Sequence, residues 1–257
     1  MSQSKISKIE TGRIVPSLTD VERILQALNV PAEVRAEVAA LARPAGIEFQ
    51  SVRGMRRKGL DRKQEELGSL EATTAEFRFF LPAMITALIS TPEYIRASMA
   101  HNRGDTTKAV ARKLDRQAVL YDPAKRFTFL LTEAAARWPV SPAAVMATQL
   151  DWLATLSHLP NVRLGIIPVS ARQLRGPLNT FTVYDDRLVT AETFGGALVM
   201  RVPRDVVLHL DLFASFGEAA VFRDAARELL AKWAAEFRPG NLFQLRNSAI
   251  QDLSSLY

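Results

Sequence analysis

Apolar residues recur every three to four positions over the first 43 residues, which is the spacing of one face of an α-helix. Ile6 and Ile9 share such a face, and a second stripe covers residues 18–28. Pro31 suits the first turn of a further helix. The pattern therefore predicts three helices over residues 1–43.

The pattern changes beyond this point. Residues 44–69 are rich in charge and interrupted by glycines, and we interpret them as a basic linker. Residues 70–237 mix helical stripes with short apolar runs, which are typical of buried strands. We expect strands at 127–131, 162–167, 180–184, 188–193 and 198–202.

These patterns together predict an α+β fold. An all-α N-terminal part over residues 1–43 precedes a mixed α/β C-terminal domain over residues 70–237, with a small sheet of about five strands. Residues 238–257 form a tail of weaker periodicity. Thr91, Pro92 and Glu93 mark one helix start within the C-terminal domain, as an N-cap, a first-turn proline and an acid near the positive end of the helix dipole.

The first helix is polar and basic on the surface away from Ile6 and Ile9. The side chains there are those of Gln3, Ser4, Lys5, Ser7 and Lys8. Amide, hydroxyl and ammonium groups hydrogen-bond base edges and phosphates, so we predict that they face the major groove of DNA. Arg13, just after the helix, is predicted to contact a phosphate. The alternative is an ordinary amphipathic helix.

Residues 4–13, followed by Pro16 and Ser17, resemble the recognition helix and following turn of Xre-type helix-turn-helix repressors. Residues 92–97, 112–120 and 131–134 are similar, in this order, to segments of the C-terminal domain of actinobacterial antitoxin-like Xre regulators, a domain of unknown function. The resemblance covers most of the chain. Residues 86–91 depart from it, because the family tends to have Pro-Gly-Leu-Leu-Gln-Thr there.

The resemblance implies a cytoplasmic, nucleoid-associated transcription regulator that binds double-stranded DNA and has a small partner protein encoded nearby. In such domains two helices usually precede the recognition helix, whereas this chain starts at it. We therefore expect a partial helix-turn-helix, with its first two helices missing. Two alternatives stay open, namely a partner-binding, antitoxin-like protein without DNA binding and an enzyme housed in the C-terminal domain.

We also expect a homodimer, because helix-turn-helix proteins usually read two half-sites. The helices that close the chain carry more apolar side chains than one buried face easily absorbs: Val206, Leu208, Leu210, Leu212, Phe213, Phe216, Val221 and Phe222. The interface is therefore predicted in the C-terminal domain. The alternative is that these helices are sandwiched in its core.

Composition and charge exclude few classes of function. The 257 residues carry a net charge of +6, which permits nucleic acid without demanding it. Residues 53–63 are strongly basic and suggest phosphate contacts, although a solvated linker explains them equally well. The chain has no cysteine, which excludes disulfides and thiol catalysis and fits a reducing cytoplasm. Its longest apolar stretch is broken by Pro82, so we expect no membrane span.

Candidate chemistry is sparse. Glu133 and Glu192 each follow a strand-like run and could serve acid–base chemistry or bind a cationic ligand. Acids of this kind more often pair with arginines, and Arg112, Arg116 and Arg137 are the candidates. The three histidines lack metal-binding spacing, so we expect no metal, no cofactor and no enzymatic activity.

Overall fold

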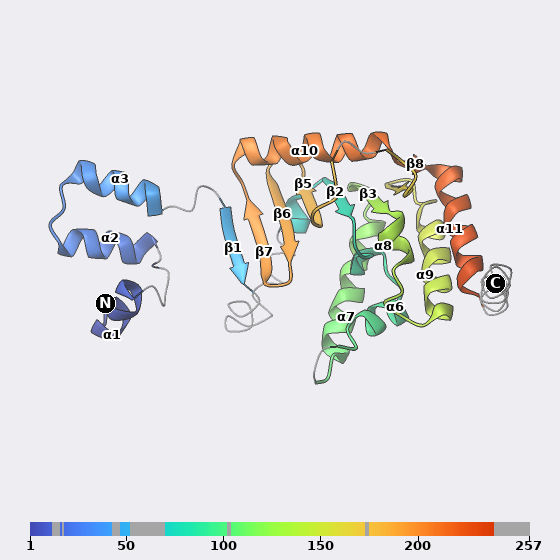
Figure 1. The fold of residues 1–257 in the computed structure, drawn as a ribbon, viewed down its shortest axis with the longest axis horizontal. Helices are drawn as coiled ribbons and strands as arrows, with labels where there is room; N and C mark the ends of the chain where they lie inside the picture. The colour runs from blue at the N-terminus through green and yellow to red at the C-terminus, as the bar shows by residue number, and fades with distance from the viewer. Residues whose placement is uncertain are drawn as a thin grey trace, which may run out of the picture.

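The computed structural model describes residues 1–11, 16, 18–42, 47–51, 70–101, 104–172 and 175–238. The N-terminal part consists of α1 (Gln3–Glu10), α2 (Leu18–Ala27) and α3 (Ala32–Ala42) (Figure 1). Ser2 caps α1, because its hydroxyl accepts a hydrogen bond from the backbone N–H of Lys5 at 3.3 Å. Asn29 follows α2 with a positive φ of 51°, a conformation that asparagine tolerates. The prediction of three helices is confirmed.

The C-terminal part is built on one sheet of eight strands. Neighbour by neighbour, the strands are β1 (Ile47–Ser51), β7 (Gly196–Met200), β6 (Leu188–Thr193), β5 (Phe181–Tyr184), β2 (Glu76–Leu81), β3 (Arg126–Thr132), β4 (Val162–Ile167) and β8 (Val221–Phe222). Strands β2, β3 and β4 are parallel, and every other pairing is antiparallel. The α+β class is confirmed, but the prediction of about five strands is wrong.

Three strands were missed, each for a different reason. Strand β1 lies within residues 44–69, which the charge pattern assigned to a linker, yet Phe49 pairs with Leu198 of β7. The first part of that segment therefore belongs to the sheet. Strand β2 shows an apolar run whose alternation breaks where Phe80 and Leu81 stand together. Strand β8 has only two residues and was absorbed into the predicted closing helix.

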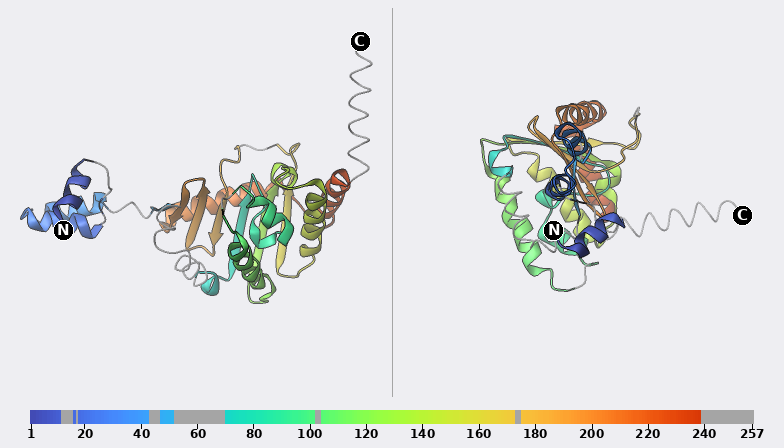
Figure 2. Two further views of the ribbon diagram at one scale, coloured as in Figure 1. Left: turned by 90° about the horizontal axis from the view of Figure 1, so that it is seen from below. Right: turned by 90° about the vertical axis from the view of Figure 1, so that its left-hand side faces the viewer.

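Helices cover both faces of the sheet (Figures 1 and 2). One face carries α10 (Pro203–Glu218), which runs across the strands. The other carries η1 (Ala87–Ile89), α6 (Pro92–Ser98), α7 (Thr107–Asp115), η2 (Arg116–Tyr121), α8 (Glu133–Arg137), α9 (Ala143–Leu156) and α11 (Arg223–Phe237). The predicted start of α6 is confirmed, since Thr91 accepts a hydrogen bond from the N–H of Tyr94 at 3.2 Å.

The core beneath α10 contains side chains that were predicted to form a dimer interface. Val206, Phe213 and Phe216 are buried there, and Phe216 stacks on Phe80 with 4.2 Å between ring centroids. A buried aromatic pair stabilises its own domain and is not available to a second copy. The prediction that these three side chains form an interface is therefore wrong, whereas Leu208 on the same helix is 46% exposed.

Candidate functional site

The outward surface of α1 is the first candidate site. Gln3, Ser4, Ser7 and Lys8 are exposed, while Ile6 and Ile9 on the opposite side are half-buried. Four polar side chains are thus presented to solvent on two successive turns of one helix. This arrangement can donate and accept hydrogen bonds along a nucleic-acid groove.

The environment of Lys5 differs from that of the other residues on α1 that were predicted to contact DNA. Its Nζ lies 2.6 Å from Oδ1 of Asp20, a buried carboxylate on α2. This ion pair links α1 to α2, so Lys5 supports the position of α1 instead of standing free for DNA. Arg13 and the basic run at 53–63 lie outside the described residues.

The second candidate site lies on the sheet face opposite α10. One row of paired residues crosses six strands there: Leu164, Phe129, Phe79, Thr182, Thr190 and Val199. The described helices on this side lie over β2, β3 and β4, and β5 to β7 extend beyond them (Figure 2). At this boundary the row changes from aromatic residues to threonines.

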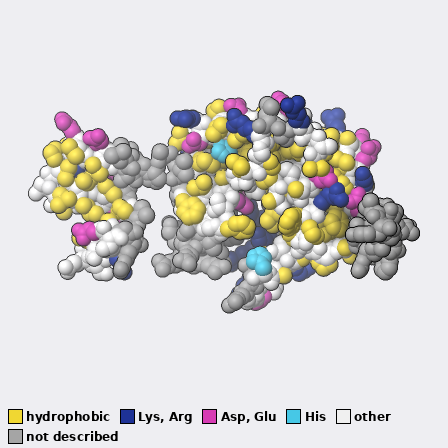
Figure 3. Space-filling view, viewed as in Figure 1, with side chains coloured by type: hydrophobic (Ala, Val, Ile, Leu, Met, Phe, Trp, Pro, Cys, Tyr) yellow, Lys and Arg dark blue, Asp and Glu magenta, His cyan; other side chains and the backbone are white. Residues whose placement is uncertain are grey.

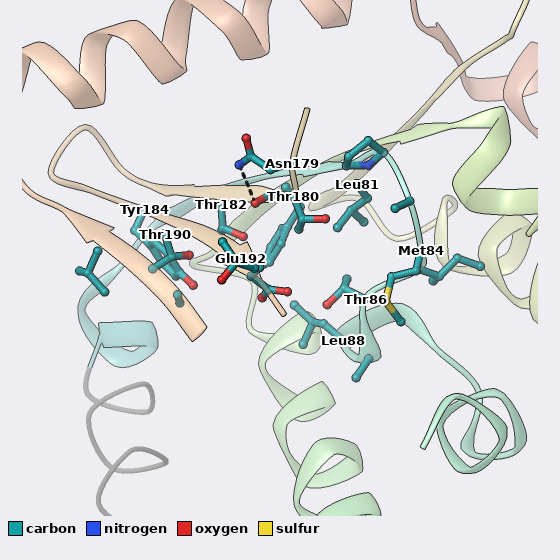
Figure 4. A pocket seen from close by; sticks show the side chains of 18 of the residues that line it. Leu81, Met84, Thr86, Leu88, Asn179, Thr180, Thr182, Tyr184, Thr190 and Glu192 are labelled. Carbon is teal, nitrogen blue, oxygen red and sulfur yellow. Dashed lines mark hydrogen bonds between the residues drawn. The ribbon is translucent and has the colours of Figure 1, made fainter. Parts of the chain in front are cut away.

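A cavity of about 1450 Å³ opens over the threonine half of the sheet. Figure 3 shows the surface of this part of the molecule hollowed between hydrophobic side chains. In the close view of Figure 4, Thr182, Thr190 and Glu192 lie on the strands and face Thr86 and Leu88 across the cavity. The wall formed by the strands is therefore polar, and the opposite wall is largely apolar.

On the side of the cavity opposite the strands, two glutamine side chains form hydrogen bonds with the backbone. The buried Gln149 of α9 accepts a hydrogen bond from the N–H of Thr91 at 2.7 Å and donates one to the carbonyl of Ile89 at 2.9 Å. Gln117 donates to the carbonyls of Ala87 and Ser90, both at 2.7 Å. These bonds satisfy backbone groups in and next to the short helix η1. Neither glutamine was predicted as a site residue, although a glutamine inside an apolar helix such as α9 indicates a buried hydrogen-bonding role.

The end of the cavity near Tyr184 contains several interacting groups. Arg116 pairs with Glu71, with side-chain exposures of 34% and 11%. Burial raises the pKa of Tyr184, and its hydrogen bond with the side chain of Thr190 offsets part of that rise. Tyr184 is therefore neutral at physiological pH and acts as a hydrogen-bonding group.

The predicted carboxylates lie in separate places. Glu192 is exposed and lines the cavity together with Arg116, and the arginine pairing that was considered for it is not formed among the described residues. Arg112 is half-buried on α7 and is not among the residues that line the cavity. The structure therefore brings Arg116 and Glu192 to one cavity without pairing them.

Glu133 starts α8 and is half-buried. Its Oε1 lies 2.6 Å from Arg137, and its Oε2 accepts a hydrogen bond from the N–H of Val169 at 3.0 Å. Burial alone would raise the pKa of Glu133, but the Val169 N–H and the Arg137 guanidinium outweigh burial and lower it. Glu133 thus forms the arginine pair that was considered for it, away from the cavity.

Two features are absent from the described part of the chain, namely a metal-binding cluster and a membrane-spanning helix. No group of three or more histidine, aspartate or glutamate side chains is arranged there to hold a metal ion. Among the same residues, no helix is both long and apolar enough to cross a membrane.

The fold and these sites define a helix-turn-helix protein with an α+β C-terminal domain. Residues 1–38 match the model of a helix-turn-helix domain, a fold that binds DNA. Residues 64–232 match the model described as "Domain of unknown function (DUF5753)". Because this match spans more than half of the chain, the protein belongs to the DUF5753 family. No curated protein matches the chain.

Solved structures give only distant likenesses. NucT from Helicobacter pylori is 8% identical, covering 69% of this chain and 98% of its own, with a TM-score of 0.41. Nuc from Salmonella typhimurium, a phospholipase D family member, is 8% identical over 69% and 97%, with a TM-score of 0.38. TrmBL2, an archaeal chromatin protein, is 12% identical over 79% and 66%, with a TM-score of 0.32. These TM-scores are too low to support an argument.

Proposed function

We propose that this protein is a DNA-binding transcription regulator of the Xre type, and that the cavity of its C-terminal domain is an effector site. The observation that carries the DNA-binding role is the surface of α1. Gln3, Ser4, Ser7 and Lys8 face solvent, while the 2.6 Å ion pair between Lys5 and Asp20 holds α1 to α2. A polar helix held in place by its neighbour is what groove recognition requires.

The experiment is a titration of the full chain against a mixed-sequence duplex of about 30 base pairs, long enough for two half-sites one turn apart. Replacing Lys8 with glutamine should weaken binding and reduce the slope of log affinity against log salt by about one. The matched control is Lys108→Gln on α7, an exposed lysine outside α1 that loses the same charge. Equal effects of the two substitutions would contradict a contact at α1.

The proposal includes a homodimer, because two half-sites call for two recognition helices. On α10, the side chains of Val207 and Leu208 are exposed, whereas that of Phe216 is buried. Leu208→Glu should therefore give a folded monomer by sedimentation, while Phe216→Glu should unfold the domain. A folded dimer of the Leu208 variant would place the interface elsewhere.

We also propose an antitoxin-like role in the cytoplasm on the nucleoid, with a small partner protein and without enzymatic activity. The support is the resemblance carried by residues 4–13 and by the segments 92–97, 112–120 and 131–134. Co-expression with the product of the adjacent gene tests it. The expected result is a stable complex at fixed stoichiometry, and two independently eluting proteins would contradict it.

A further inference from the structure

The cavity is lined by cations and by one carboxylate without a partner. Of the cations, Arg116 is paired with Glu71, and Lys113 and Arg201 each interact with another part of the chain. The carboxylate of Glu192 forms no hydrogen bond or ion pair with any residue that the structure describes. Among the described residues that line the cavity, Glu192 is therefore the charged residue whose side chain forms no hydrogen bond or ion pair.

Threonines occupy the positions next to Glu192 on the same face of the sheet. Glu192 donates its backbone N–H to the carbonyl of Thr180 at 2.9 Å, so the two residues are direct neighbours across β5 and β6. Thr182 and Thr190, which pair with each other, occupy the next position on the same face. An ammonium group has three donors and no acceptor, so a carboxylate among hydroxyl oxygens suits it.

Three of the exposed side chains that line the cavity are large and apolar. Met84, Leu178 and Phe194 line it from three separate segments, and they are 45%, 92% and fully exposed, respectively. Large apolar side chains gathered around one opening indicate a surface that is covered when its ligand binds. Burying them against an apolar group removes that surface from water.

We propose that the cavity binds an organic cation, namely a protonated amine attached to an apolar body. The amine contacts Glu192 and the neighbouring threonine hydroxyls, and the apolar body lies among Met84, Leu178 and Phe194. This inference rests on the proposed role of the cavity as an effector site and names the chemistry of its ligand.

The test is isothermal titration calorimetry of the full chain with three indole compounds. Tryptamine, tryptophol and indole-3-acetate share the ring and end in an ammonium, a hydroxyl and a carboxylate, respectively. A charge-assisted hydrogen bond is about twice as strong as a neutral one, so tryptamine should bind at least about tenfold more tightly than tryptophol. Indole-3-acetate should bind most weakly.

Three variants measure separately how the amine and the apolar body of the ligand contribute to affinity. Glu192→Gln should make the affinities for tryptamine and tryptophol equal. Phe194→Ser should weaken both by a similar factor, because it removes apolar contact and leaves the charge. Trp138→Ser is the matched control, since Trp138 is an exposed aromatic residue outside the cavity and its loss should change neither affinity.

Several results would overturn the inference: no binding of tryptamine, tighter binding of indole-3-acetate, or unchanged selectivity in Glu192→Gln. DNA binding is measured on the same chain without any indole compound. If only ligand binding fails, the proposal that the cavity binds an organic cation is refuted. If only the Lys8 experiment fails, the DNA-binding role of α1 is refuted.

Discussion

Two halves of the same sheet face have opposite chemistry. On β2 and β3, Phe79 and Phe129 stack with 4.8 Å between ring centroids, and Phe77 and Phe127 repeat this arrangement at the same spacing. On β5 and β6, the same row continues as Thr182 and Thr190. The first half belongs to the core beneath the helices, with Phe79 also at the edge of the cavity, and the second half lines the cavity.

This difference marks the boundary between the part of the sheet face that packs in the core and the part that lines the cavity. A strand face that a helix will cover is stabilised by apolar side chains, which lose their contact with water. A threonine in the same position keeps a hydroxyl that must find a partner or remain hydrated. The change therefore suits a surface meant to receive a polar group, and we expect substitutions in the two halves to act differently.

The largest effect is expected in the covered half. Phe129→Ala removes a fully buried ring, and such substitutions cost about 3–5 kcal/mol of stability. Thr182→Ala, in the same row, should cost less than about 1 kcal/mol, because its hydroxyl has the cavity beside it. Denaturation by urea, followed by circular dichroism, measures both. Similar losses would mean that the two halves are one continuous core.

A second loss of stability is expected at the wall opposite the strands. Gln149→Met keeps the volume but leaves the N–H of Thr91 and the carbonyl of Ile89 without partners. Each buried unsatisfied group costs about 1–3 kcal/mol, and the cavity should lose its shape as well. Tryptamine affinity should therefore fall together with the melting temperature. A stable variant with normal affinity would show that this wall does not depend on Gln149.

The seam between β2 and β5 should respond to pH. The carboxylate of Asp185 accepts hydrogen bonds from the N–H groups of Ala75 and Glu76, at 3.0 and 2.9 Å. Burial would raise the pKa of Asp185, but these N–H groups and the Arg187 guanidinium outweigh burial and lower it. A lowered carboxyl pKa stabilises the fold above the unfolded value of about 3.9. That stabilisation is lost as the pH falls through the folded value.

Asp185→Asn tests this seam without disturbing the backbone, because asparagine also tolerates the positive φ of 51°. It should cost about 1–2 kcal/mol at pH 7. Unfolding curves recorded between pH 7 and pH 3 should show that the difference in unfolding free energy between the variant and the wild-type chain disappears below about pH 4. If this difference stays constant with pH, the loss comes from the shape of the side chain and not from its charge.

Sequence patterns predicted the elements whose periodicity is undisturbed. The five expected strands correspond to β3–β7, where apolar runs are bounded by turn residues. Strand β1 was hidden because Glu48 and Gln50 alternate with Ile47 and Phe49 inside a charged segment, and only its pairing with β7 defines it. An edge strand can be recognised from its sequence only when its partner is known.

The site was less predictable than the fold. Glu192 was identified as a candidate, but its relation to Thr182 depends on the register of β5 and β6, which no local pattern encodes. The ion pair of Lys5 with the buried Asp20 likewise depends on how α1 packs on α2. Residues with unusual chemistry could be selected from the sequence, whereas their neighbours could not.

The central claim is that the threonine half of the sheet face is a binding floor and not an unfinished core. Calorimetric titration of tryptamine into Thr182→Leu tests it most directly, because leucine fills the floor and removes the hydroxyl. We expect a folded variant, as stable as the wild-type chain or more so, whose affinity for tryptamine falls at least about tenfold. Undiminished affinity in that variant would contradict the claim.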